Sequence, residues 1–148
     1  MYRMALMVAV MDCPALDMRR CMEMCLVHDL AEAIVGDITP ECGVSVKDKH
    51  RMEREAMEQI SASLGSTPEA SKIKQLCEEY EANRTAEAHF VHELDKLECA
   101  LQTWEYEMKH GITLDCFIAN AEKHIKHPTL RKIMDLIISR RSDHKIAV

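Results

Sequence analysis

The sequence has little of several residue types that mark other classes of protein. Its 148 residues include 4 glycines, 4 prolines, 1 tryptophan, 3 tyrosines and 2 phenylalanines, and 47% of the residues are hydrophobic. This composition excludes collagen-like and disordered chains. A chain of this length buries roughly 68–70% of its unfolded surface, so it can form a core without disulfides or a structural metal. We therefore predict one globular domain over residues 1–148.

The sequence also has fewer basic than acidic side chains. There are 25 acidic and 19 basic side chains, which give a formal net charge of -6 and an isoelectric point near 5.7. Duplex nucleic acid binds through a cationic surface, so it is not an expected partner. A single nucleotide is not excluded, because one phosphate can be held by a metal ion and one or two basic side chains.

The sequence contains neither a CxxC pair nor an apolar run long enough to span a bilayer. We interpret the cysteines as reduced thiols of a cytoplasmic protein. The short apolar run near the N-terminus has no cleavage site of the kind found in signal peptides, so no membrane partner is predicted. The seven scattered cysteines are Cys13, Cys21, Cys25, Cys42, Cys77, Cys99 and Cys116.

Long segments without glycine or proline, rich in Met, Leu, Ala, Glu and Lys, predict an all-α fold class. We expect a compact single domain of about six to seven helices. In the longest of these, apolar residues recur every three or four positions from Phe90 to Met108, which is typical of a core or a dimer seam. The expected helices lie near residues 2–11, 16–35, 45–64, 68–81, 85–110, 114–125 and 128–141.

The segment from Leu26 to Ile38 places polar groups in apolar surroundings. On a continuous helix, Glu32 lies four residues after His28 and three after Asp29, so the three side chains project from one side. Burying such groups is costly unless they are paired or bind a metal. An imidazole with carboxylates is a ligand set for Mn, Co, Fe, Zn or Mg. The alternative is a His–Asp hydrogen-bonded pair with Glu32 facing solvent.

Five further charged positions are candidates for the same site. Asp37 follows an expected helix end, where a turn can fold its carboxylate back over the preceding residues. Asp95 flanks the apolar face of the longest helix, and Lys96 beside it is a candidate phosphate contact. Lys49 and Arg51 belong to a compact basic group that either meets a phosphate or forms a solvated helix face.

The joint pattern, HDxxExxxxD followed by Asp95 in LDKLE 58 positions after Asp37, resembles the HD-domain metal-dependent phosphohydrolases. The closer similarity is to their 5′-deoxynucleotidase subgroup, and it extends over essentially the whole chain. The resemblance implies a homodimeric hydrolase that converts 2′-deoxynucleoside 5′-monophosphates to deoxynucleoside and phosphate. It also implies attack by a metal-activated water, without a covalent enzyme intermediate.

The resemblance assigns roles to individual positions. His28, Asp29 and Asp95 are the implied ligands of a catalytic divalent cation, which would be Mn²⁺, Co²⁺ or Mg²⁺, with Zn²⁺ as an alternative. Glu32 resembles the residue that positions or deprotonates the attacking water, and Asp37 is the accompanying carboxylate. Glu32 has a competing role as a ligand, and the sequence does not choose between the two. The implied ligands of a second ion are Glu32, Asp37 and the carbonyl oxygen of Ile38.

The chain departs from the family pattern at its beginning. The family has a further His ligand immediately before the segment that matches Met1 to Ala5, and an upstream helix that contributes an Arg and a Trp to the substrate pocket. We therefore expect an HD domain that is incomplete at its N-terminus, with reduced metal affinity and activity in this form. One alternative is a non-catalytic, degenerate HD-domain module that binds nucleotide or protein. Another is a phosphodiesterase acting on a cyclic or pyrophosphorylated nucleotide.

Overall fold

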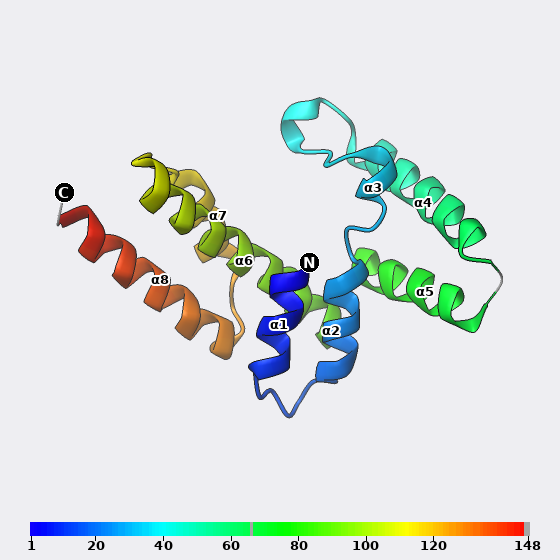
Figure 1. Ribbon diagram of the computed structural model, residues 1–148, viewed down its shortest axis with the longest axis horizontal. Helices are drawn as coiled ribbons and strands as arrows, with labels where there is room; N and C mark the ends of the chain where they lie inside the picture. Colours follow the sequence, from blue (N-terminus) through cyan, green and yellow to red (C-terminus); the bar gives the residue numbers. More distant parts are fainter. Residues whose placement is uncertain (66, 147–148) are drawn as a thin grey trace.

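The computed structural model describes residues 1–65 and 67–146, and these residues form helices and connecting turns without a strand, as predicted (Figure 1). Seven helices have nine residues or more, and α3 is a single turn. None of the helices in this part of the chain combines the length and apolar character needed to cross a membrane. The elements are α1 (Tyr2–Val10), α2 (Met18–Val27), α3 (Glu32–Val35), a 3₁₀ helix η1 (Pro40–Cys42), α4 (Val46–Ser63), α5 (Pro68–Ala82), α6 (Ala86–His110), α7 (Asp115–His124) and α8 (Pro128–Ile146).

Local sequence signals account for the starts of four helices and the end of one. The side chains of Asp17, Ser45, Thr67 and Thr85 each accept a hydrogen bond from the backbone N–H three residues later, and so cap α2, α4, α5 and α6. Gly111 ends α6 with a φ of 63°, a left-handed conformation that glycine adopts without strain. The predicted starts of these helices, and the predicted end of α6, are therefore close to the observed ones.

The continuous helix expected over 16–35 is wrong. The chain winds more tightly after α2, since the backbone N–H groups of Leu30, Glu32 and Ala33 each donate to the carbonyl three residues earlier. This is the 3₁₀ pattern of hydrogen bonds. The His28 ring also binds the Cys25 carbonyl, which a continued α-helix would offer to the following backbone. The change from α-helical to 3₁₀ hydrogen bonding therefore begins at His28 and Asp29.

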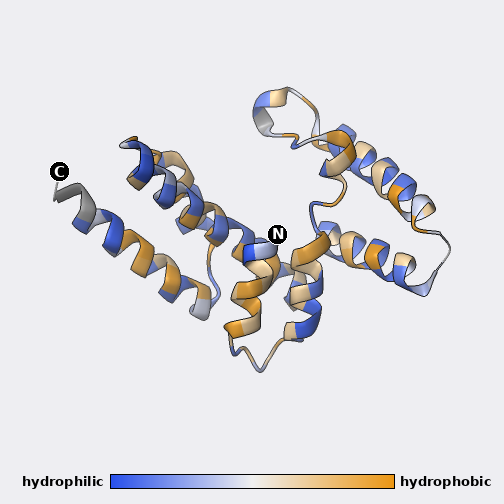
Figure 2. Cartoon of the chain, in the orientation of Figure 1, coloured by the Kyte–Doolittle hydropathy of each residue, from blue (hydrophilic) through white to orange (hydrophobic). Residues whose placement is uncertain are grey.

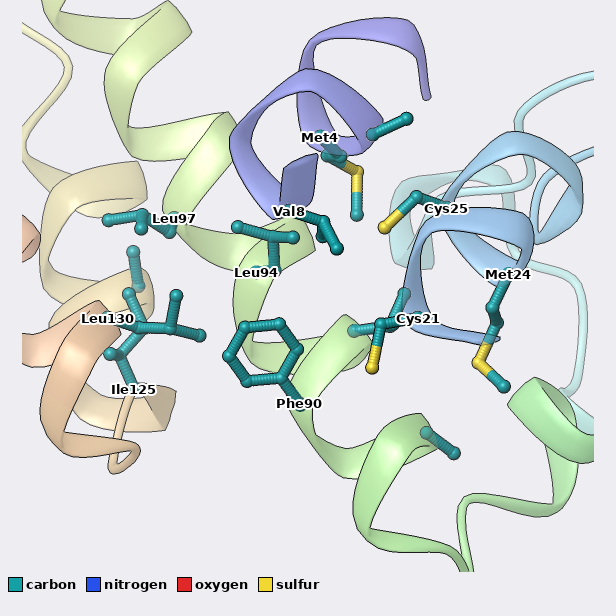
Figure 3. Close-up of a cluster of buried hydrophobic side chains, with 14 of the residues drawn as sticks. Met4, Val8, Cys21, Met24, Cys25, Phe90, Leu94, Leu97, Ile125 and Leu130 are labelled. Carbon is teal, nitrogen blue, oxygen red and sulfur yellow. The ribbon is translucent and has the colours of Figure 1, made fainter. Parts of the chain in front are cut away.

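The main hydrophobic core lies where α1 and α2 pack against α6, with α7 and α8 on its other side (Figures 1 and 3). Phe90, Leu94 and Leu97 are fully buried, so the first part of the apolar stripe in α6 is core. Trp104 is half-buried and Met108 is exposed, so the stripe leaves the core toward the end of the helix. The core residues labelled in Figure 3 are Met4, Val8, Cys21, Met24, Cys25, Phe90, Leu94, Leu97, Ile125 and Leu130.

A second, smaller hydrophobic cluster holds α4 and α5 against the turn between α2 and α3. Its buried members are Ala31, Ala56, Met57 and Cys77. Figure 2 shows α4 as mainly hydrophilic, in contrast to α1, which is hydrophobic along much of its length. Because α5 also packs against α2 and α6, it joins the small cluster to the main core.

Candidate active site

A cavity of about 820 Å³ is lined by α3, α4, α5, α6 and the turn that follows α2. Acidic side chains outnumber basic ones in its lining, with seven carboxylates and four basic groups. A phosphate-bearing ligand would be repelled from such a surface unless cations bind there. The carboxylates belong to Asp29, Glu32, Asp37, Glu53, Glu78, Glu81 and Asp95, and the basic groups to Lys49, Arg54, Lys74 and Lys96.

His28, Asp29 and Asp95 come together at one side of this cavity, and we call them the first metal group. One ligand atom of each residue lies within 4.8 Å of the other two. The His28 side chain is 0% exposed, and its Nδ1 donates to the carbonyl of Cys25 at 3.1 Å. That hydrogen bond directs Nε2 toward the carboxylates, 3.0 Å from Asp29 Oδ2 and 3.9 Å from Asp95 Oδ1.

The first metal group fits a divalent cation. His28 Nε2 is buried and makes no hydrogen bond of acceptable geometry within the described chain. A cation bound between Nε2 and the two carboxylates would satisfy this nitrogen better than the poorly aligned contact with Asp29 does. One imidazole nitrogen and two carboxylate oxygens are suitable donors for Mn²⁺, Co²⁺ or Zn²⁺, and the hydrogen bond at Nδ1 is the support that metal-binding imidazoles usually have.

Tyr80 and His92 support the imidazole from the α5 and α6 side. The Tyr80 ring lies 4.8 Å from the His28 ring, and it stacks on His92 with 3.8 Å between centroids and 10° between planes. The Nε2 of His92 is also 2.9 Å from the Tyr80 carbonyl oxygen, so the His92 ring contacts both the backbone and the ring of Tyr80. The role of Tyr80 is not visible in the sequence, because a contact between residues on distant helices has no local signature.

Charges around His28 shift the pKa values of the group. Burial lowers the pKa of His28, but the adjacent Asp29 and Asp95 carboxylates raise it on balance to about 9. Burial raises the pKa of Asp95, whereas His28 and Lys96 lower it on balance to about 2. The Nζ of Lys96 lies 2.8 Å from Asp95 Oδ2. In the metal-free protein, a protonated imidazole therefore balances the carboxylates.

Glu32 and Asp37 line the same cavity. Burial, with repulsion from Asp29 and Asp37, raises the pKa of Glu32 to about 6. The Ile38 carbonyl, expected to be a ligand of a second ion, instead accepts a hydrogen bond from Lys49 Nζ at 3.1 Å. The ammonium group of Lys49 thus contacts the Ile38 carbonyl oxygen in the structure.

Two of the three basic residues expected to bind substrate face the cavity. Lys49 and Lys96 are in its lining, but Arg51 is not, and Arg54 of the next turn is. Arg51 is exposed and pairs with Asp48 and Glu55 of its own helix, α4. Two positions along an α-helix correspond to about 200° of rotation, which places Arg51 on the face opposite Lys49.

A family model and curated relatives match nearly the whole chain. The family described as HD domain matches residues 1–136. The 5′-deoxynucleotidase hdd1 of Schizosaccharomyces pombe is 40% identical over 145 residues, which are 95% of this chain and 73% of that protein. The human 5′-deoxynucleotidase HDDC2 is 42% identical over 147 residues, which are 96% of this chain and 70% of that protein.

Solved structures have the same helical arrangement. The HD domain-containing protein YGK1 superposes with a TM-score of 0.77 at 26% identity, over 96% of this chain and 74% of that one. A predicted metal-dependent phosphohydrolase of Magnetospirillum magnetotacticum gives a TM-score of 0.67 at 26% identity, with the same coverage. These matches confirm the resemblance seen in the sequence. The chain belongs to the HD domain family.

Proposed function

We propose that the protein is a metal-dependent 5′-deoxynucleotidase, which hydrolyses 2′-deoxynucleoside 5′-monophosphates to deoxynucleoside and inorganic phosphate. The observation that carries the proposal is the buried Nε2 of His28, which faces the carboxylates of Asp29 and Asp95 in an 820 Å³ cavity. A cavity of this volume lies in the range that accommodates small organic ligands. The relatives at 40% and 42% identity are named for this activity.

His28, Asp29 and Asp95 would hold the cation, which we expect to be Mn²⁺, Co²⁺ or Mg²⁺, with Zn²⁺ as an alternative. When bound, such a cation polarises the phosphate and lowers the pKa of a bound water. Before a cation can bind to His28 Nε2, this nitrogen has to release its proton. Lys96 holds the Asp95 carboxylate through its 2.8 Å contact.

Glu32 accepts the proton of the attacking water on its carboxylate. A pKa of about 6 leaves Glu32 mainly ionised at neutral pH and still basic enough to take up a proton. Asp37 acts as the accompanying carboxylate, since its charge contributes to that raised pKa. We prefer this role to one as ligand of a second ion with Asp37 and Ile38, because Lys49 already binds the Ile38 carbonyl.

Lys49 and Lys96 provide positive charge for the substrate phosphate. Both side chains are partly exposed and line the cavity from α4 and α6. Arg54 replaces Arg51 as the arginine that faces the ligand, because Arg51 is paired elsewhere. The ammonium groups of Lys49 and Lys96 can balance the charge of a phosphate without fixing the position of the nucleoside.

We also propose that residues 1–148 form one HD domain that acts as a cytoplasmic homodimer. Exposed apolar side chains near the end of α6 and beyond it support an interface. The free cysteines support a reducing compartment. The exposed apolar residues are Tyr106, Met108, Ile112 and Phe117.

The activity is tested by phosphate release from paired deoxy- and ribonucleoside 5′-monophosphates with Co²⁺, Mn²⁺ or Mg²⁺. We expect metal-dependent release that prefers deoxy substrates and is lost in Asp95→Ala. Glu78→Gln is the matched control, because Glu78 lines the cavity outside the first metal group. Release that persists in Asp95→Ala, or no release with any metal, would contradict the proposal.

A further inference from the structure

Three more ligand-type side chains converge on the α4–α5 wall of the cavity. His50 and Glu53 are three residues apart on α4 and share one face of it, and Glu81 comes from α5. One ligand atom from each lies within 4.8 Å of the other two, and all three residues line the cavity. We call them the second group. None of the roles discussed above involves these residues.

Glu53 gives an independent sign that a ligand belongs in this group. Its side chain is only 12% exposed, and its Oε2 is buried without a hydrogen-bond partner in the part of the chain that is described. Lys49 approaches the other carboxylate oxygen, Oε1, at 3.5 Å, which is a weak contact. A buried carboxylate oxygen without a partner is costly, and a nearby cation would remove that cost.

The separation of the other two donors suits a metal ion. His50 Nδ1 and Glu81 Oε2 form a hydrogen bond of 3.0 Å, which a metal ion would replace. Two ligand atoms at about 2.1 Å from one ion, and at right angles as seen from it, are also separated by about 3.0 Å. Both side chains are partly open to solvent, so a cation can reach them without unfolding of either helix.

The charge of the cavity also favours a second cation. Its seven carboxylates and four basic groups leave a formal excess of three negative charges. One divalent ion at the first metal group reduces this excess without removing it. A second divalent ion makes the lining positive, which is the sign that a phosphate-bearing ligand requires.

We propose that His50, Glu53 and Glu81 form a second divalent-cation site, which links α4 to α5 inside the cavity. An imidazole with two carboxylates suits transition cations such as Co²⁺, Mn²⁺ or Zn²⁺ better than Ca²⁺, which prefers oxygen ligands alone. The proposed site does not depend on hydrolytic activity, so a measurement of metal binding alone tests it.

The test is the number of Co²⁺ ions bound per chain, measured by equilibrium dialysis with metal analysis on the full-length protein. We expect two ions in the wild type, and one in Glu53→Gln and in Glu81→Gln. Glu78→Gln should keep both, because Glu78 is a cavity-lining carboxylate of α5 outside the second group. The His28→Ala variant should bind one ion, at the second group, and the double variant with Glu53→Gln should bind none.

Circular dichroism melts provide a second readout. Saturating Co²⁺ should raise the melting temperature of His28→Ala, and should no longer raise it when His50→Ala is added, because the second group then lacks its imidazole. His50 is exposed, so its replacement leaves the packing of α4 intact. One ion in the wild type, or two ions that Glu53→Gln and Glu81→Gln both retain, would overturn the proposal.

Discussion

A cation that binds to the first metal group must displace a proton from His28. Burial lowers the pKa of this imidazole, whereas Asp29 and Asp95 raise it on balance to about 9. At pH 7 the protonated form therefore predominates about 100-fold, which weakens cation binding by about 2.7 kcal/mol. The affinity should rise about tenfold per pH unit from pH 7 and level off above pH 9. The carboxyl of Asp95, with a pKa of about 2, releases no proton in this range.

Isothermal titration calorimetry of the metal-free protein measures this displacement directly. Titrations with Co²⁺ between pH 7.0 and 8.5, in two buffers of different ionisation enthalpy, give the number of protons released per ion. We expect close to one proton in the Glu53→Gln background, in which the first metal group is isolated. As a control without metal, an NMR titration of Asp95→Asn should show that the pKa of His28 falls, because one of the two carboxylates that raise it is gone. An affinity that does not change with pH, or no proton release, would refute the reasoning.

Two further variants test the base and the core. Glu32→Gln should lower kcat at least about 100-fold, because the amide cannot accept a proton, while Co²⁺ stoichiometry stays at the wild-type value; loss of an ion would instead identify Glu32 as a ligand. Leu94→Ala should lower the free energy of unfolding by about 2–5 kcal/mol, since the side chain of this α6 residue is fully buried in the main core. Urea denaturation measures this change, and a loss below about 1 kcal/mol would show that the core collapses around the gap.

Helix positions were largely predictable from the sequence because their signals are local. Thr67 with Pro68, and Asp17 before α2, act within a single turn of backbone. The break after Val27 was not predictable in this way. It depends on the ring of His28 binding the Cys25 carbonyl and packing against Tyr80, and Tyr80 lies on a helix far along the chain.

The candidate site was predictable only in part. His28 and Asp29 are neighbours in sequence, but their meeting with Asp95 was expected from the family resemblance and not from periodicity. The approach of Lys49 to the Ile38 carbonyl depends on how the α3–α4 turn folds back, which the residue pattern does not specify. The second group was missed for the same reason, since its ligands reach one another only when α4 and α5 pack together.

The two hydrophobic clusters meet the cavity from different sides. His28 and Asp95 stand on or beside helices that are packed into the larger cluster, whereas Lys49 and Glu53 stand on α4, which the smaller cluster holds. Substitutions that reshape α4 therefore act directly on the Lys49–Glu53 wall, and they reach His28 only through the turn that the smaller cluster also holds. The wall formed by α4 can therefore change while the larger cluster keeps α6, and with it Asp95, in place.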